Sequence, residues 1–289
     1  MVAVLITGAT RGLGRSIVEA LATRRGNGES SHAIFCGCRD MHAGAELASN
    51  LHERFGGGGA AFAHPVQLDV TDGESVAAAA ATITAHGHRL DAVVNNAGVL
   101  LEREGCALAG IVEPSLAVNF DGLVSVTEAF LPLIRDGGQI INVSSGAGTR
   151  TTGSLSDATR AELAACADAA SLREVIAALA RDSAARPHES GETPIYGLSK
   201  CAVNYYTQLL ARSTSVCVNA CSPGFCDTEI AGPKVAGGRE PKEPSLGATV
   251  VLKLLFGELG NGTGGFYKES SRPGTPLHLA KSVEESWVS

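Results

Sequence analysis

The sequence contains no apolar run close to the ~20 residues that a helix needs to cross a bilayer, which argues against a membrane partner. Its N-terminus lacks a basic segment, a long apolar segment and the Arg- and Ser-rich composition of a transit peptide, so we expect a cytoplasmic location. Basic residues are in the minority. The formal net charge of −7 favours solubility and argues against a nucleic-acid partner.

None of the eight cysteines belongs to a CxxC pair, and the eight histidines are dispersed. This spacing argues against a zinc site or a disulfide framework, so we expect free thiols and no bound metal. The cysteines are Cys36, Cys38, Cys106, Cys166, Cys201, Cys217, Cys221 and Cys226.

Aromatic residues are also scarce, at 4% of the chain, whereas glycine occurs 35 times. This composition suits tight turns between strands and helices around a core of Ala, Val, Leu and Ile. A chain of 289 residues fits one enlarged α/β domain, residues 1–289, better than two domains.

Apolar runs of strand length alternate with longer segments of helical periodicity. Several of the runs are continuously apolar, which predicts a parallel sheet covered by helices on both faces. The expected fold is α/β, a doubly wound parallel sheet of the Rossmann type, with ligands outside the carboxyl ends of the strands. The expected strands are 2–7, 33–38, 66–69, 92–95, 139–144, 215–221 and, more weakly, 265–268; the expected helices are 14–24, 41–55, 74–86, 114–135, 194–212 and 246–259.

Residues 146–195 interrupt this alternation with a long insertion. Four apolar residues from Leu172 to Leu179 recur at helical spacing, which predicts a helix capped by Ser171, and residues 186–191 predict a loop. A long excursion in a compact domain usually carries a function or covers a surface. A surface excursion without a function is the alternative.

The segment Thr7-Gly8-Ala9-Thr10-Arg11-Gly12-Leu13-Gly14 directly follows the first expected strand and opens the first helix. Gly8 permits a sharp turn, Gly12 lets the backbone approach a pyrophosphate, and Gly14 allows the helix to pack closely on the strand. The helix N-terminus offers free amides and a positive dipole end to phosphate oxygens. A tight turn without a ligand is the alternative.

Tyr196 and Lys200 stand four residues apart on an expected helix and therefore share one face. A free phenol has a pKa near ~10 and is a poor proton shuttle at neutral pH. A nearby ammonium lowers that pKa toward the range where acid–base catalysis works. The pair therefore suits proton transfer, although each residue alone also fits a structural role.

The glycine segment TGATRGLG resembles the cofactor signature of the short-chain dehydrogenase/reductase family. Further segments resemble that family's motifs in the same order between positions 7 and 228. They are Asn95-Asn96-Ala97-Gly98, Asn119 within Val118-Asn119-Phe120, Ser144-Ser145, the YxxxK pair of Tyr196 and Lys200, and Pro223-Gly224 with Thr228.

The resemblance implies a catalytic role for four residues. Tyr196 would protonate a carbonyl oxygen as hydride arrives from the nicotinamide, and Ser145 would hydrogen-bond the same oxygen. Lys200 would also bind the nicotinamide ribose, and Asn119 would hold a water behind Lys200. The implied cofactor contacts are Gly8, Thr10, Arg11, Gly12, Leu13, Gly14, Arg39, Asp69, Val70, Asn95, Ala97, Gly98, Asn119, Tyr196, Lys200, Pro223, Gly224 and Thr228.

The end of the second expected strand indicates which cofactor is preferred. An NAD enzyme places an acidic residue there to accept from the ribose 2′-hydroxyl, but this position is Cys38 and Arg39 follows it. Arg11 is a second nearby cation, and guanidinium groups match a 2′-phosphate in geometry and charge. We therefore expect NADP(H) as the cofactor. NAD is the alternative, because Asp40 follows Arg39 and could serve as the acid that binds the ribose.

Ser145 and Tyr196 are separated by 51 positions, which resembles the carbonyl reductase branch of the family. Residues 231–234 and 262–267 are similar to that branch as well. The resemblance implies a monomer that reduces the carbonyl of a small-molecule ketone, aldehyde or quinone with NADPH.

Two other functions stay open. One is a non-catalytic NADPH-binding sensor or regulator on the same fold, and the other is a narrow ketone reductase of one pathway. Retention of all four catalytic residues favours an enzyme over a sensor. Cys226, beside the segment expected to contact nicotinamide, is a spectator thiol or a redox-sensitive one.

Overall fold

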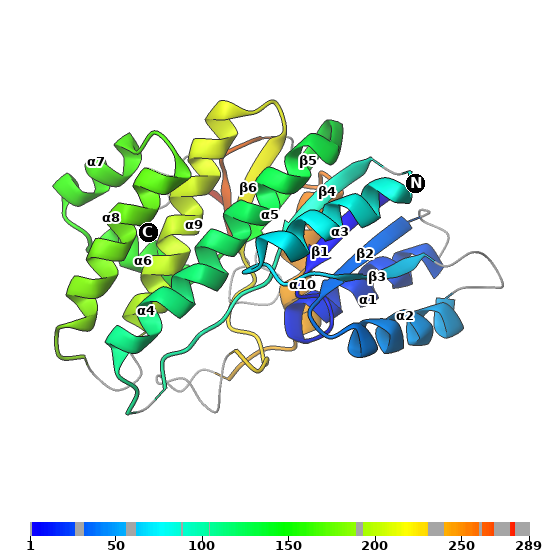
Figure 1. Ribbon diagram of the computed structural model, residues 1–289, viewed down its shortest axis with the longest axis horizontal. Helices are drawn as coiled ribbons and strands as arrows, with labels where there is room; N and C mark the ends of the chain where they lie inside the picture. Colours follow the sequence, from blue (N-terminus) through cyan, green and yellow to red (C-terminus); the bar gives the residue numbers. More distant parts are fainter. Residues whose placement is uncertain are drawn as a thin grey trace.

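The computed structural model describes residues 2–26, 32–55, 62–87, 89–103, 105–188, 193–230, 240–259, 262–268 and 278–280 (Figure 1). The strands in these ranges form one sheet in the order β3-β2-β1-β4-β5-β6-β7-β8. Strands β1 to β7 pair in parallel, and β8 runs antiparallel to β7. The strands are β1 (Val2–Thr7), β2 (His32–Cys38), β3 (Ala63–Gln67), β4 (Leu90–Asn95), β5 (Ile134–Val143), β6 (Cys217–Ser222), β7 (Phe266–Lys268) and β8 (His278–Ala280).

Helices cover both faces of this sheet, so the predicted doubly wound α/β fold is confirmed. One hydrophobic core lies between the sheet and helices α1, α2 and α10, and a second lies under α3, α4, α5, α8 and α9. Side chains of successive strand residues lie in opposite cores; Leu5 belongs to the second core and Ile6 to the first. The helices are α1 (Gly12–Gly26), α2 (Met41–Phe55), α3 (Gly73–Ala85), α4 (Leu108–Leu116), α5 (Gly122–Phe130), α6 (Gly146–Ser154), α7 (Asp157–Ala165), α8 (Ala169–Ala184), α9 (Pro194–Ser213) and α10 (Pro244–Leu255).

Several predicted elements were wrong in extent, among them β5, which begins at Ile134 and not at residue 139, and α10, which ends at Leu255 and not at residue 259. Strand β3 begins three residues before the predicted start and includes Pro65, which lacks a donor for the sheet ladder. Proline is tolerated there because β3 is an edge strand. The expected helix 114–135 instead begins at Leu108, and Arg135 belongs to β5.

Helix α4 continues through a π-helical turn, η1 (Ala117–Asp121), into α5 and a short 3₁₀ turn, η2 (Leu131–Leu133). The whole run, Leu108–Leu133, is long and apolar enough to cross a membrane by length and composition, which the sequence reading did not anticipate. Its parts pack against α3, α8 and α9, and its buried residues belong to the second core. It is therefore placed as a core helix of the α/β fold.

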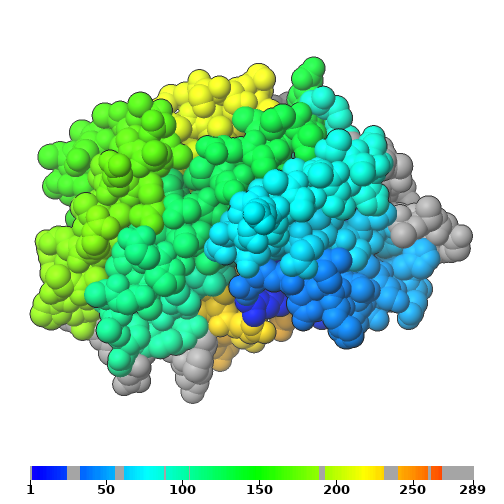
Figure 2. Space-filling view, viewed as in Figure 1, coloured from blue at the N-terminus to red at the C-terminus, as the bar shows by residue number. Residues whose placement is uncertain are grey.

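The insertion forms three helices, of which only the third was predicted. Asp168 caps α8, not Ser171. The Asp168 carboxylate accepts from Ser171 N at 2.8 Å, and the Ser171 hydroxyl occupies the third position of this capping box. Helices α7 and α8 form the left end of the molecule beside α9 (Figures 1 and 2). The predicted loop 186–191 is described only as far as residue 188, and residues 231–234 lie outside the described ranges.

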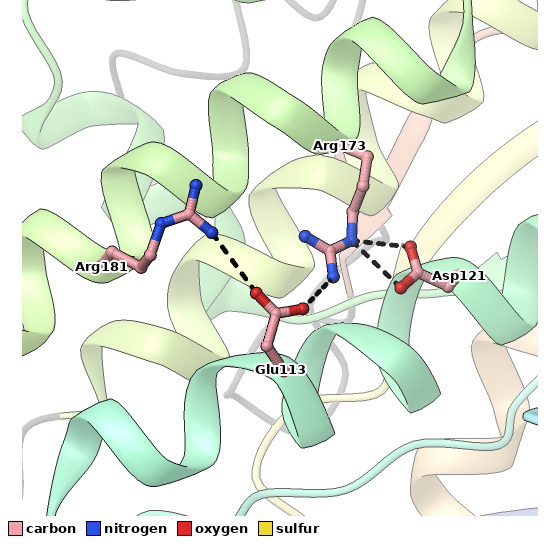
Figure 3. A network of polar contacts seen from close by, with 4 residues as sticks. All are labelled: Glu113, Asp121, Arg173 and Arg181. Carbon is pink, nitrogen blue, oxygen red and sulfur yellow. Dashed lines mark hydrogen bonds and ion pairs between the residues drawn. The ribbon is translucent and has the colours of Figure 1, made fainter.

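A network of ion pairs joins α8 to α4 and to the π-turn (Figure 3). Arg173 Nε donates to both carboxylate oxygens of Asp121, at 2.8 and 3.0 Å, and its Nη2 donates to Glu113 at 2.6 Å. Arg181 reaches the other Glu113 oxygen at 3.4 Å. The insertion is thereby tied to the turn that carries Asn119.

Candidate active site

The glycine segment forms the predicted turn between β1 and α1. Gly8 has a φ of +65°, a conformation that side chains disfavour. A Cβ at Gly14 would lie 2.2 Å from the Gly8 carbonyl oxygen, so the first turn of α1 packs against the loop more closely than any other residue permits. The free amides of the α1 N-terminus face the same loop, which suits an anionic ligand.

Thr7, at the end of β1, holds the turn that follows β4. Its hydroxyl accepts from the backbone amides of Asn96 and Ala97, at 3.0 and 2.9 Å. The Asn96 side chain donates back to the carbonyls of Thr7 and Gly8. Asn95 points the other way, into the core, where it donates to Thr127 and Asn142. In this turn Asn96 lines the cavity and Asn95 does not.

A cavity of about 1420 Å³ follows the carboxyl ends of all seven parallel strands, where the fold predicts a ligand site. The sequence-predicted residues that line it are Gly8, Thr10, Arg11, Gly12, Leu13, Gly14, Arg39, Asp69, Val70, Ala97, Gly98, Ser145, Tyr196, Lys200, Pro223, Gly224 and Thr228. Asn95 and Asn119 lie behind the wall and do not line it.

Three of the four predicted catalytic residues meet in this cavity. The Ser145 hydroxyl is near enough to Tyr196 to lower the pKa of its phenol. Ser145 also caps α6 by accepting from Ala147 N at 3.1 Å, which fixes its side chain. Lys200 Nζ lies 5.9 Å from the centre of the Tyr196 ring and donates to the Val143 carbonyl at 2.8 Å.

Burial changes the protonation of this group in a direction that the sequence reading did not predict. It raises the pKa of Tyr196, although the hydrogen bond from Ser145 opposes the effect. Burial lowers the pKa of Lys200 to about 8. Loss of solvation is the largest effect on the Tyr196 pKa in the protein alone, and the lowering of that pKa by Lys200 stays a prediction.

Asn119 lies in the π-turn and bonds Ser199, the residue before Lys200; π-turns inside helices are frequent at functional sites. Its Oδ1 accepts from Val99 N at 2.7 Å, and its Nδ2 donates to Val99 O and to Ser199 Oγ. A Cβ at Gly98 would lie 3.2 Å from Asn119 Oδ1 and 3.5 Å from Lys200 Nζ. Gly98 therefore sits where these two polar atoms converge.

Glu102 is a site residue that the sequence reading missed. It comes from the segment between β4 and α4, is 8% exposed, and accepts from Tyr196 N at 2.7 Å. Its second carboxylate oxygen is buried and has no hydrogen-bond partner among the described residues. Burial is the main cause of the raised Tyr196 pKa, and the Glu102 carboxylate raises it further, while Arg150 lowers it. Glu102 and Tyr196 are 94 positions apart, so no local pattern links them.

At the far end of the cavity, Cys38 is buried and directs its thiol to the Val66 carbonyl. The following Arg39 is exposed and lines the cavity. Asp40 is engaged in capping α2, because its carboxylate accepts from His42 N and Ala43 N. The strand end thus presents a protonated thiol, a guanidinium that lowers the pKa of Asp69, and a carboxylate that caps α2.

Arg11 forms an ion pair of 2.7 Å with Glu229, a partner that the sequence did not suggest. Both side chains are exposed. Glu229 follows Thr228, whose methyl carbon would lie 3.1 Å from a Cβ at Gly12. The segment after β6 therefore closes over the glycine turn.

Residues 2–157 match the family model of the short chain dehydrogenase. The chain belongs to the short-chain dehydrogenase family. It is 29% identical over 275 residues to a short-chain dehydrogenase/reductase of Aspergillus fumigatus, with 89% of each chain covered. It is 28% identical over 270 residues to carbonyl reductase [NADPH] 1 of Homo sapiens, covering 87% of this chain and 90% of that one.

Solved structures share the fold of this short-chain dehydrogenase. Salutaridine reductase from Papaver somniferum superposes with a TM-score of 0.72 at 24% identity, covering 93% of this chain and 100% of that one. Menthone neomenthol reductase from Mentha piperita gives a TM-score of 0.72 at 23% identity, covering 92% and 98%.

The cysteines of this dehydrogenase are all free. Within the described ranges, no three His, Cys, Asp or Glu side chains are grouped so as to hold a metal ion. Burial raises the pKa of Cys226, which lines the cavity, and Lys242 opposes this effect.

Proposed function

We propose that this protein reduces the carbonyl group of a ketone, an aldehyde or a quinone to an alcohol with NADPH. The observation that carries the proposal is the convergence of Ser145, Tyr196 and Lys200 on a cavity that also contains the glycine turn. The glycine cradle and the α1 N-terminus fit a dinucleotide, since a Cβ at Gly14 would collide with the loop. When bound, the cofactor supplies a hydride to the carbonyl carbon.

The protein's residues would orient and protonate the carbonyl oxygen. Ser145 would donate a hydrogen bond that orients it, and Tyr196, a protonated phenol at neutral pH, would give it a proton. The Lys200 ammonium stabilises the phenolate that forms and binds the nicotinamide ribose. Asn119 connects Lys200 to a water path for the returning proton.

The choice of NADPH over NADH rests on the residues at the end of β2. Arg39 offers a cation to a 2′-phosphate, Cys38 cannot serve as the ribose acceptor of an NAD enzyme, and Asp40 is occupied by α2. A charge-assisted hydrogen bond contributes about 1.5–3 kcal/mol. Arg39→Asp should therefore weaken NADPH use tenfold or more, and equal use of both cofactors by the unmodified protein would refute this choice.

The names of relatives agree with the proposal, since carbonyl reductase [NADPH] 1 is similar over most of both chains. We extend it to a cytoplasmic monomer, in which α7 and α8 cover the face that would otherwise pair. Light scattering at micromolar concentration measures the oligomeric state directly, and a stable dimer or tetramer would overturn the monomer proposal.

Tyr196→Phe is the decisive test, because it removes the hydroxyl and keeps the ring. NADPH should still bind, as measured by fluorescence titration, while turnover falls by about 10²- to 10⁴-fold. A variant with near-normal turnover would show that another group is the acid. If the unmodified protein binds NADPH but reduces none of a broad carbonyl panel, a sensor or a narrow reductase of one pathway becomes the better reading.

A further inference from the structure

Two cationic side chains line the cavity next to the catalytic serine. Arg150 lies on α6 with its guanidinium over Gly146, because a Cβ at Gly146 would lie 3.5 Å from Arg150 Nη1 and 4.0 Å from Ser222 Oγ. Lys268, at the end of β7, is the sheet neighbour of Ser222. Both cations are cavity-lining residues. They therefore flank the place where Ser145 and Tyr196 would hold a carbonyl oxygen.

The two cations also act on the same region electrostatically. Burial lowers the pKa of Lys268, and Arg150 lowers it further. Arg150 also lowers the pKa of Tyr196, against the effect of burial. Within the described part of the chain, neither Arg150 nor Lys268 has a carboxylate partner. Among the described residues, neither cation is therefore paired with a carboxylate at the edge of the cavity.

None of the described carboxylates that line the cavity forms an ion pair with Arg150 or Lys268. Glu229 is paired with Arg11, Asp69 accepts from Thr71, and Asp40 caps α2. Glu240 is exposed. Glu102, behind Tyr196, is not a lining residue. The positive side chains beside Ser145 therefore lack a built-in counter-ion among these groups.

We propose that the substrate is an oxo acid, whose carboxylate is held by Arg150 and Lys268 while its carbonyl oxygen contacts Ser145 and Tyr196. This proposal rests on the proposed carbonyl reduction. The carboxylate takes no part in the bond changes. It orients the substrate, since planar guanidinium groups bind carboxylates with two parallel hydrogen bonds and lysine adds a point charge.

The test compares each acid with its neutral methyl ester. Benzoylformate, 3-formylbenzoate and 4-formylbenzoate place the carboxylate at different distances from the carbonyl. At least one acid should exceed its ester in kcat/KM by about tenfold, the discrimination expected of one charge-assisted contact. The preference should shrink when the ionic strength rises from about 0.01 to about 1 M, because Arg150 is exposed.

Matched variants assign the preference to the two cations. Arg150→Met and Lys268→Met should each lower kcat/KM for the preferred acid about tenfold and that for its ester less than about threefold. Lys253→Met, in the last turn of α10 and away from the cavity lining, should change neither. The Kd for NADPH should be unchanged in all three, because the cations serve the substrate and not the cofactor phosphates.

A binding measurement separates this proposal from the proposed function. Calorimetric titration of the NADP⁺-loaded protein should show benzoate binding more tightly than benzamide, and Arg150→Met should abolish the difference. Ester reduction with no preference for any acid would overturn the oxo-acid proposal alone, as would a weaker Kd for NADPH in Arg150→Met. Arg150-dependent benzoate binding without reduction of any acid or ester would refute the reductase and keep the anion subsite.

Discussion

The link between the insertion and the rest of the fold can be measured through Arg173. Arg173→Met keeps the aliphatic stem and removes three charge-assisted hydrogen bonds, two to Asp121 and one to Glu113. The Arg173 side chain is only 21% exposed, but its partners are 42% and 62% exposed, so solvent screening reduces each bond. We expect a total loss of about 1.5 kcal/mol in the free energy of unfolding.

That loss converts to a modest shift in melting temperature. A chain of 289 residues has an unfolding entropy of about 0.6 kcal/mol/K, so the midpoint should fall by about 2–3 °C in scanning calorimetry at a fixed scan rate. Arg181→Met is the control, because Arg181 makes a single 3.4 Å contact between two groups that are each 62% exposed. It should shift the midpoint by less than about 1 °C. Equal shifts for the two variants would refute the assignment of the link to Arg173.

Three further results are expected. Lys200 has a pKa of about 8 against an ordinary 10.5, so the unfolded chain binds more protons between these values. The free energy of unfolding should therefore rise with pH across that window in the unmodified protein, relative to Lys200→Met. Over the same range, kcat/KM for NADPH should fall above about pH 8. A kcat/KM that first declines at about pH 10 or above would contradict this prediction. Gly14→Ala should abolish NADPH binding and cost about 1–3 kcal/mol of stability through overpacking, whereas Gly110→Ala, with open space around it, should not destabilise. Glu102→Gln keeps an acceptor for Tyr196 N and removes a charge that raises the Tyr196 pKa. The absorbance of the Tyr196 phenolate, assigned by difference from Tyr196→Phe, should therefore appear at lower pH. An unchanged titration would contradict this role of Glu102.

The parts of the site that the sequence predicted are those encoded within a few consecutive residues. The glycine turn depends on contacts between Gly8 and Gly14, and the Tyr196–Lys200 pair depends on one helical turn. Asn95 was misplaced because neighbouring residues at a strand end point in opposite directions, and only the packing shows which of Asn95 and Asn96 faces the cavity.

Properties that depend on distant residues or on burial could not be predicted in the same way. Arg11 and Glu229 are 218 positions apart, so their ion pair has no local signal. The low pKa of Lys200 follows from its enclosure between α9 and β5, which the sequence does not display. The fold class was predictable because alternation of apolar runs is a property of the whole chain. The start of β3 was predicted too late, since the strand includes Pro65, a residue that sheets tolerate only at an edge.

The two ends of the insertion are anchored by residues outside it. Gly146 N, just after Ser145, donates to Ser222 of β6, and Tyr196 N donates to Glu102 of the segment after β4. The spacing between the catalytic hydroxyls is thus set by the sheet and its neighbouring segments, not by the length of chain that connects them. No described residue of α7 or α8 lines the cavity, although α8 packs into the core beside α9. Evolution or engineering can therefore vary the outward-facing residues of these two helices while Ser145 and Tyr196 keep their positions.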